Sequence, residues 1–309
     1  MYIKGGCKMN AIEIKNLTKN FGSKQAVSGL NMTVPKGAIY GFIGENGSGK
    51  STTEKMVCGL LVPSGGEIKL FGRDDSDADI RKKVGVLIEA PGCYQNYSVW
   101  NNLMLEAANL QIKNPKAEVA KVLKTVRMEG AAGNKYKNCS LGMKQRIGIA
   151  MALLGNPTLL VLDEPINGLD TDGMRIMRDI LTDITRNHEC TVLVSSHILG
   201  ELEKIATHYG IIRGGKMIKE MTAEKLDAGC RKYAALQTKD MNRTKAILSA
   251  KYSHVEEDEA GYIRVYDAVA PENMVDYLYE NGILIGEIKT AKISLEEYYI
   301  DLMHEKEGE

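Results

Sequence analysis

The hydrophobic and polar positions of this chain follow two patterns, one typical of strands and one typical of helices. Short, largely apolar runs at residues 38–43, 158–162 and 191–194 have the composition of strands buried in a sheet. Residues 12–17 and 29–34 alternate apolar and polar side chains, which predicts an antiparallel, hairpin-like layer. Because buried strands alternate along the chain with segments of helical spacing, we expect an α/β fold.

Changes in this pattern divide the chain into two parts. Residues 99–126 predict two helices, which belong to a helical subdomain expected at about residues 90–156. That subdomain lies within a first domain of residues 1–221. Beyond Thr222 the sequence is charged and poor in glycine. We expect residues 222–309 to form a small α+β domain, in which no candidate chemistry is visible.

The glycine-rich segment 44–52 lies between a predicted strand and a predicted helix, which is the context of a phosphate-binding loop. Gly44, Gly47 and Gly49 are expected to adopt backbone conformations closed to residues with a Cβ, so that consecutive N–H groups surround an anion. A helix that begins at about Lys50 adds unpaired N–H groups, and the Lys50 side chain can reach β- and γ-phosphates. The candidate phosphate-binding residues are Gly44, Asn46, Gly47, Ser48, Gly49, Lys50, Ser51 and Thr52. A glycine-rich surface turn, the alternative, would not need a flanking strand and helix.

Two adjacent carboxylates, Asp163 and Glu164, follow an apolar strand that Pro165 ends. Successive side chains of a strand point in opposite directions, so we expect the two acids to have different roles. Asp163 suits a Mg²⁺ ion that the Ser51 hydroxyl also binds, and Glu164 suits proton acceptance from an attacking water. An exposed acidic turn is the alternative interpretation.

Three further side chains allow two interpretations each. His197 follows a buried strand at the sheet edge where ligands gather in doubly wound folds, although a lone histidine is more often structural. Phe21 precedes a turn glycine and either stacks on a base or belongs to the core. Ser140 precedes a predicted helix, where it either helps to bind a phosphate or simply caps the helix.

Composition narrows the classes of function. The chain has 309 residues, of which 44% are hydrophobic, so it can form substantial cores. Forty basic residues balance forty acidic residues, which argues against nucleic acid as the main partner. The longest apolar stretch, residues 147–162, is interrupted at residues 155–157 and falls short of the roughly 20 residues that span a bilayer. We therefore expect no membrane-spanning segment.

The cysteines and the start of the chain favour a cytosolic protein. The cysteines occur singly, without a CxxC pair or a histidine at metal-ligand spacing, which is typical of a reducing compartment. They are Cys7, Cys58, Cys93, Cys139, Cys190 and Cys230. The first eight residues lack the apolar core of a signal peptide, and Met9 could be the natural start.

Taken together, these motifs resemble the ATP-binding subunits of ABC transporters over about residues 12–218. Residues 140–145 are similar to the signature sequence of that family, although Cys139 replaces the usual Leu and Leu141 replaces a usual Gly. The remaining motifs of the family are matched, in order and spacing, by residues 160–165, residues 168–170 and His197.

The resemblance implies a P-loop NTPase fold of the ABC type, with an antiparallel β layer and a helical subdomain, and it implies ATP and Mg²⁺ as ligands. Two ATP-binding subunits, identical or different, would pair head to tail, so that Ser140 and Gly142 of one complete the γ-phosphate site of the other. Phe21 would stack on adenine, and His197 would orient the γ-phosphate and the attacking water. The pair would drive a separate membrane permease as a peripheral assembly on the cytoplasmic face of the cell membrane.

Glu89 departs from the family pattern. It ends an apolar strand predicted at residues 84–89, beyond a solvated loop predicted at residues 74–79. The family usually carries a Gln there, which contacts Mg²⁺ and faces the membrane subunit, and a Glu resembles the subunits that export bacitracin-like or lantibiotic peptides. A carboxylate only accepts hydrogen bonds and adds negative charge, which suits a metal and opposes the γ-phosphate. A surface carboxylate without a role is the alternative.

Two other functions use the same phosphate loop. Soluble ABC-type ATPases that act on ribosomes or DNA usually carry two tandem motif sets or a long coiled coil, whereas this chain has one set and no sustained heptads. A small-molecule kinase is disfavoured by residues 140–145 and by Glu164 beside Asp163. An ATPase that drives export is the leading hypothesis.

Overall fold

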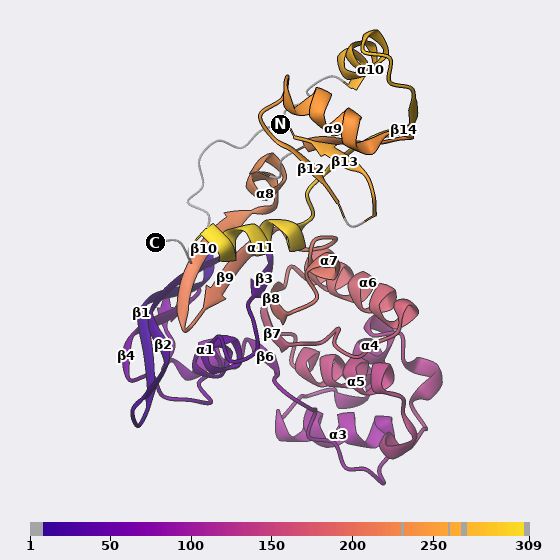
Figure 1. Cartoon of the computed structure of the whole chain (residues 1–309). Helices are drawn as coiled ribbons and strands as arrows, with labels where there is room; N and C mark the ends of the chain where they lie inside the picture. The colour runs from indigo at the N-terminus through magenta and orange to yellow at the C-terminus, as the bar shows by residue number, and fades with distance from the viewer. Residues whose placement is uncertain (1–8, 230–231, 259, 267–270, 306–309) are drawn as a thin grey trace, which may run out of the picture. The chain divides into compact units, whose positions relative to one another are not determined.

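The computed structural model describes residues 9–229, 232–258, 260–266 and 271–305 (Figure 1). Cys7, Cys230 and the possible extra residues before Met9 lie outside this part of the chain. The chain forms two compact units, Met1–Ala223 and Glu224–Glu309, and each unit is described by itself.

A six-stranded sheet forms the centre of the first unit. Its strands are β3 (Ile39–Ile43), β6 (Val84–Leu87), β7 (Leu159–Asp163), β8 (Thr191–Ser196), β9 (His208–Arg213) and β10 (Lys216–Thr222). They lie in the order β10, β9, β3, β8, β7, β6, and every neighbouring pair is parallel except β9 with β10. All residues of β3 and β8 are buried, because both strands have neighbours on each edge and carry the apolar runs of the sequence.

A second, antiparallel sheet covers helix α1 (Lys50–Val57). Its strands are β1 (Asn10–Phe21), β2 (Lys24–Pro35), β4 (Gly65–Leu70) and β5 (Arg73–Asp74). The predicted hairpin is confirmed, with Ile14 opposite Met32. Both residues belong to one buried cluster with Met56 of α1 and Val161 of β7, so α1 is held by apolar packing between the two sheets.

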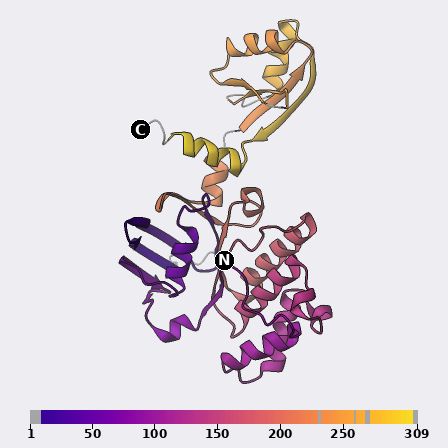
Figure 2. The ribbon, with the colours of Figure 1, turned by 60° about the horizontal axis from the view of Figure 1, so that its bottom comes forward.

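The other helices of the first unit are α2 (Ala78–Arg81), α3 (Val99–Asn109), α4 (Pro115–Thr125), α5 (Leu141–Leu153), α6 (Thr171–His188) and α7 (Leu199–Leu202), with short 3₁₀ helices at Glu129–Ala131 and Tyr136–Asn138. The two helices expected within residues 99–126 are confirmed as α3 and α4. The loop expected at residues 74–79 is partly wrong, because the Asp77 side chain accepts hydrogen bonds from Asp79 N and Ile80 N and so caps α2. Figures 1 and 2 show the antiparallel strands on one side of the first unit and helices α3, α4 and α5 on the other.

The second unit is an α+β fold. It contains β11 (Lys232–Thr238), β12 (Val255–Glu257), β13 (Ile263–Val265), β14 (Ile285–Lys292), α9 (Met241–Ser249), α10 (Pro271–Glu280) and α11 (Leu295–Glu305), and α8 (Ala223–Gly229) begins at the division between the units. The antiparallel sheet has the order β12, β13, β11, β14. Its core joins Leu236 of β11, Leu248 of α9 and Leu278 of α10. The capping box expected at the start of α11 is confirmed, since Ser294 and Glu297 exchange hydrogen bonds between side chain and backbone N–H.

We expect Gly85→Ala to lower the free energy of unfolding by about 1–3 kcal/mol through overpacking. A Cβ on Gly85 of β6 would lie against the Ala152 carbonyl oxygen of α5 and 2.6 Å from Leu160 Cδ2. Gly92→Ala is the matched control, because a Cβ there meets nothing within 4 Å. Urea unfolding checks both variants, and equal stabilities would contradict the close packing of β6 against α5.

Candidate functional site

The glycine-rich segment forms the turn between β3 and α1. Gly47 and Gly49 have φ angles of 81° and 109°, so these two glycines adopt the left-handed backbone that was expected. The same expectation is wrong for Gly44, whose φ is not positive. A Cβ there would instead lie 2.5 Å from the Ile212 carbonyl oxygen and 2.6 Å from Ser48 Oγ. Gly44 is therefore required by the close approach of β9, which local sequence does not reveal.

The loop and the first turn of α1 form an anion-binding geometry. Gly49 is the N-cap of α1, and no side chain caps the helix, so its first N–H groups remain available for a phosphate. The Lys50 side chain is 5% exposed. Its Nζ donates hydrogen bonds to the carbonyl oxygens of Gly44 at 2.6 Å and Glu45 at 3.1 Å. The lysine is thus held over the loop with its charge directed at the site.

The carboxylates at the end of β7 have different partners, as expected. Ser195 lies opposite Asp163 in the parallel register, and its Oγ donates to Asp163 Oδ1 at 2.8 Å. The same Oγ accepts from Glu164 N at 3.1 Å. Glu164 Oε2 lies 2.7 Å from His197 Nδ1, and Glu164 Oε1 lies 3.9 Å from Lys50 Nζ. The structure therefore brings Lys50, Asp163, Glu164 and His197 into one site.

Glu164 also has an unusual backbone, with φ at 49°. The left-handed conformation is uncommon for a residue with a side chain and costs of order 1 kcal/mol. It follows directly on Asp163, so the chain leaves the strand sharply between the two acids. This turn lets Glu164 reach Lys50 and His197 while Asp163 stays beside Ser195.

Sequence reasoning missed Ser195. The sequence pattern assigns it no role, although it is fully buried and bridges Asp163 to the backbone of Glu164. Its place beside Asp163 depends on the register of β7 against β8. The available signal was a hydroxyl near the end of a strand that ends at His197.

The oxygen donors of the site fit a magnesium ion bound together with a phosphate ligand. Within the described ranges, no group of three or more His, Cys, Asp or Glu side chains could hold a metal ion. Ser51, in the first turn of α1, and Asp163 offer a hydroxyl and a carboxylate. Because Mg²⁺ keeps several waters and is usually bound through one or two protein groups plus substrate phosphates, this sparse oxygen set suits it.

The other candidate residues lie in three separate places. Phe21 ends β1 and is 51% exposed, with Lys19 Nζ 5.3 Å from its ring centroid, so the core interpretation is wrong. Ser140 is confirmed as the N-cap of α5, where its Oγ accepts from Met143 N. Among the described residues, no hydrogen bond or ion pair joins Ser140 or Gly142 to the phosphate loop.

Glu89 lies beside the C-terminal half of α1, where it contacts Lys55. It follows β6 with φ at 65° and is 72% exposed. Lys55 of α1 donates to Glu89 Oε1 at 2.8 Å, and this hydrogen bond and charge hold the pKa of Glu89 below its usual value. The carboxylate therefore has a partner and is not a free surface charge.

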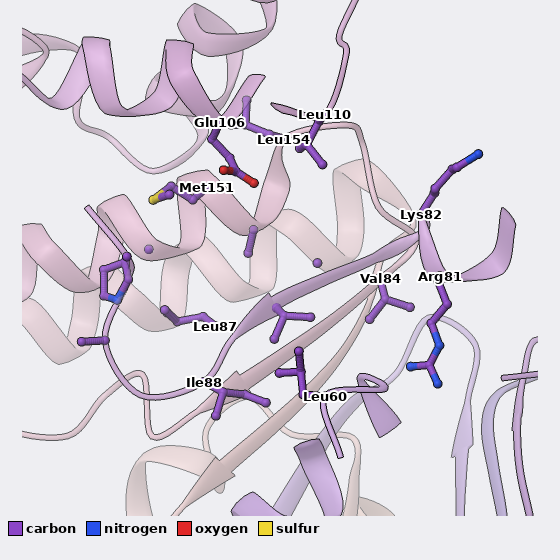
Figure 3. A pocket seen from close by; sticks show the side chains of 17 residues that line it. Leu60, Arg81, Lys82, Val84, Leu87, Ile88, Glu106, Leu110, Met151 and Leu154 are labelled. Atoms are coloured by element: carbon purple, nitrogen blue, oxygen red, sulfur yellow. The ribbon is translucent and has the colours of Figure 1, made fainter. Parts of the chain in front are cut away.

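A groove of about 470 Å³ runs along β6, and we call it the β6 groove (Figure 3). Its apolar lining includes Val84, Leu87, Ile88, Leu110, Met151 and Leu154. Charged side chains line it as well, with Glu106 on α3 and Arg81 and Lys82 before β6. β6 is an edge strand of the six-stranded sheet, so a partner can approach it from the side.

Comparisons with known proteins agree with this geometry. A family model described as "ABC transporter" matches residues 27–167. The chain is 37% identical over 297 residues to the bacitracin transport ATP-binding protein BcrA of Bacillus licheniformis, covering 94% of this chain and 97% of that protein. It is 39% identical over 209 residues to the lantibiotic transport ATP-binding protein SrtF of Streptococcus pyogenes, covering 68% of this chain and 90% of that protein.

A solved structure shows the same fold. The chain matches cbiO1 from Clostridium perfringens, part of the ABC transporter complex cbiONQ, with a TM-score of 0.66 and 24% identity over 71% of this chain and 91% of that chain. The match to BcrA, which leaves out only 6% of this chain, must extend into the second unit.

We expect Ser195→Ala to lower hydrolysis of Mg-ATP by about 10–100-fold, because the hydrogen bond that orients Asp163 is lost. Ser196→Ala is the matched control from the same strand. The Ser196 hydroxyl accepts from Ile198 N instead of contacting the acids. Steady-state phosphate release measures both rates, and an unchanged rate for Ser195→Ala would contradict this role.

Proposed function

Because the chain belongs to the ABC transporter family, as an ATP-binding subunit that hydrolyses ATP, we propose that it drives export of an antimicrobial peptide or similar amphiphile through a separate membrane permease. The observation that carries the proposal is the cluster of Lys50, Asp163, Glu164 and His197 around the phosphate loop. The cargo is proposed from the two relatives, which are named for bacitracin and lantibiotic transport. No helix in the described part of the chain is long and apolar enough to cross a bilayer.

The loop and α1 would bind the triphosphate of ATP. Lys50 would exchange its two carbonyl acceptors for the β- and γ-phosphates, while the free N–H groups at the start of α1 bind phosphate oxygens. Ser51 and Asp163 would hold Mg²⁺, whose charge offsets that of the phosphates. Phe21, exposed at the end of β1, would stack on the base.

Glu164 and His197 would act on the attacking water. Glu164 accepts its proton, and the contact of His197 Nδ1 with Glu164 Oε2 holds that carboxylate in place. His197 is 42% exposed, so its other ring nitrogen remains open to the γ-phosphate. Lys50, 3.9 Å from Glu164, keeps the carboxylate directed at the loop.

The site would be completed by a second ATP-binding subunit, identical or different. Ser140 and Leu141 are exposed at the N-terminus of α5, where N–H groups can bind a phosphate. They make no bond to the phosphate loop of their own chain in the described part. Head-to-tail pairing would bring Ser140 and Gly142 of one subunit to the loop of the other, and ATP binding would close the pair.

Glu89 would link the metal to the permease. Ser51 and Lys55 are four residues apart on α1 and therefore share a face of the helix. Glu89 pairs with Lys55, and Lys55 follows the proposed metal-binding residue by one helical turn. A modest movement of the segment after β6 would carry its carboxylate toward the ion.

We place the permease contact at the β6 groove (Figure 3). The groove is lined by residues 84–88 and 90–92, which flank Glu89, the position that faces the membrane subunit in the resembling family. Its apolar lining with Glu106 on α3 and Lys82 near the other end suits an amphipathic helix that carries charges of both signs. The chain would then work as a peripheral subunit on the cytoplasmic face of the cell membrane.

We expect Glu164→Gln to keep ATP affinity within about threefold while hydrolysis falls by about 10²–10⁴-fold, the usual contribution of a general base. Glu67→Gln, on an exposed position of β4, is the control. Calorimetry measures binding and phosphate release measures turnover. Normal turnover of Glu164→Gln would remove this residue from catalysis.

We expect the chain to co-purify with a membrane permease from native membranes in mild detergent. Leu110→Lys places a charge in the β6 groove at an exposed position, and it should reduce permease recovery by at least about tenfold without changing ATP binding. Val62→Lys, exposed and outside the groove, is the control. A soluble pair without a permease under all mild conditions would argue against transport, and equal recovery with both variants would exclude the groove as the contact.

A further inference from the structure

Helix α1 carries one acidic side chain, Glu54, and it is fully buried. Within the described part of the chain, neither of its carboxyl oxygens has a hydrogen-bond partner. An unpartnered polar group in the interior costs free energy, and a carboxylate costs more than a neutral group. A Leu or Met would fill the same space without this cost, so the carboxyl group needs a role beyond packing.

Glu54 faces the proposed metal site. It lies four residues after Lys50, on the same face of α1. Its carboxyl interacts electrostatically with Asp163 and Lys50 and lies near the Ser195 hydroxyl. Burial, followed by the negative charge of Asp163, raises the pKa of Glu54 well above its usual value. The same face of α1 carries Lys50, whose Nζ lies 3.9 Å from Glu164 Oε1 after the end of β7, and Glu54 is fully buried whereas Asp163 is partly exposed.

We propose that Glu54 is a positioning residue for Asp163, packed behind this carboxylate so that it limits its rotation and sets how tightly the site holds its divalent cation. The inference rests on the proposed function, in which Asp163 binds Mg²⁺ beside ATP. Ser195 fixes Oδ1 of Asp163 by a hydrogen bond, and Glu54 supplies a second contact from α1. One carboxylate is then restrained by both the neighbouring strand and the phosphate-loop helix.

This arrangement connects the cation site to the phosphate loop. Lys50 and Glu54 belong to consecutive turns of α1, so a helix that moves with bound phosphate also moves the group behind Asp163. Partners that hold a metal-binding carboxylate typically change metal affinity by about 10–100-fold when they are removed. A space-filling residue would change stability instead.

The test compares Glu54→Leu, Glu54→Gln and the control Met56→Leu, a volume-conserving change in the buried part of the same helix. Calorimetry measures ATP affinity as a function of Mg²⁺ concentration, and the readout is the Mg²⁺ concentration at which the increase in affinity is half-maximal. ATP affinity in EDTA and the melting temperature are measured for the same variants. Gln keeps the shape and a polar group at position 54 without an ionisable carboxyl, whereas Leu fills the space without a polar group.

We expect Glu54→Leu to need at least about tenfold more Mg²⁺, with Glu54→Gln and Met56→Leu within about twofold of the unmodified chain. ATP affinity in EDTA should stay the same, and the melting temperature of Glu54→Leu should be equal or higher, because the cost of a buried carboxyl is removed.

Two results would overturn the inference. Equal Mg²⁺ requirements for Glu54→Leu and the unmodified chain would show that Glu54 only fills space, as would a lower melting temperature without a change in Mg²⁺ requirement. An equally large loss in Glu54→Gln would show that a polar side chain of this shape is not what sets the Mg²⁺ affinity. If the unmodified chain bound no Mg-ATP, the proposed function would fail and this inference with it, whereas binding with all variants alike would refute the inference alone.

Discussion

The parallel packing of β3, β8 and β7 is the constraint on which the rest of the structure depends. Lys50 follows β3, His197 follows β8, and the two acids end β7. These residues meet only because the three strands run in the same direction and end at one edge of the sheet. Apolar side chains in the buried strands set that register, and a slip of one residue would turn every side chain to the opposite face. Hydrophobic packing thus determines the geometry of the charged site.

Much of this arrangement could be predicted from the sequence, because it depends on local patterns. The turn before Lys50, the cap of α5 at Ser140 and the capping box of α11 are each specified by a few neighbouring residues. The placement of Asp163 and Glu164 at a strand end follows from an apolar run that stops at two acids. The different partners of the two acids were expected from strand alternation, but in the structure they result from the left-handed backbone of Glu164, just beyond the end of β7.

Contacts between distant segments could not be predicted. Gly44 is a glycine because the Ile212 carbonyl of β9 approaches it. Ser195 contacts Asp163 because β8 pairs with β7, and the role proposed for Glu54 depends on the packing of α1 near Asp163. The charge of residues 74–79 predicts a solvated loop, but it does not reveal that the Asp77 side chain caps α2. In each case the sequence shows the residue type but does not show which distant residue contacts it.

Exposure distinguishes the residues that are already packed within this chain from those that the proposed pairing and nucleotide binding would cover. Lys50 and Ser195 are buried and have partners, whereas Phe21 and Leu141 are each 51% exposed although both are apolar. Single exposed apolar side chains are common on protein surfaces, but under the proposed function a nucleotide would cover Phe21 and the second subunit would cover Leu141.

The position of Phe21 has a consequence for nucleobase selectivity. A phenyl ring has no hydrogen-bonding group, and every nucleobase offers it a flat face of similar character. With Phe21 as the stacking residue, the base would add stacking energy but no hydrogen bond that distinguishes adenine from guanine. Guanosine triphosphate would therefore bind about as well as adenosine triphosphate. The proposed site would then recognise the triphosphate and discriminate little between the two purines.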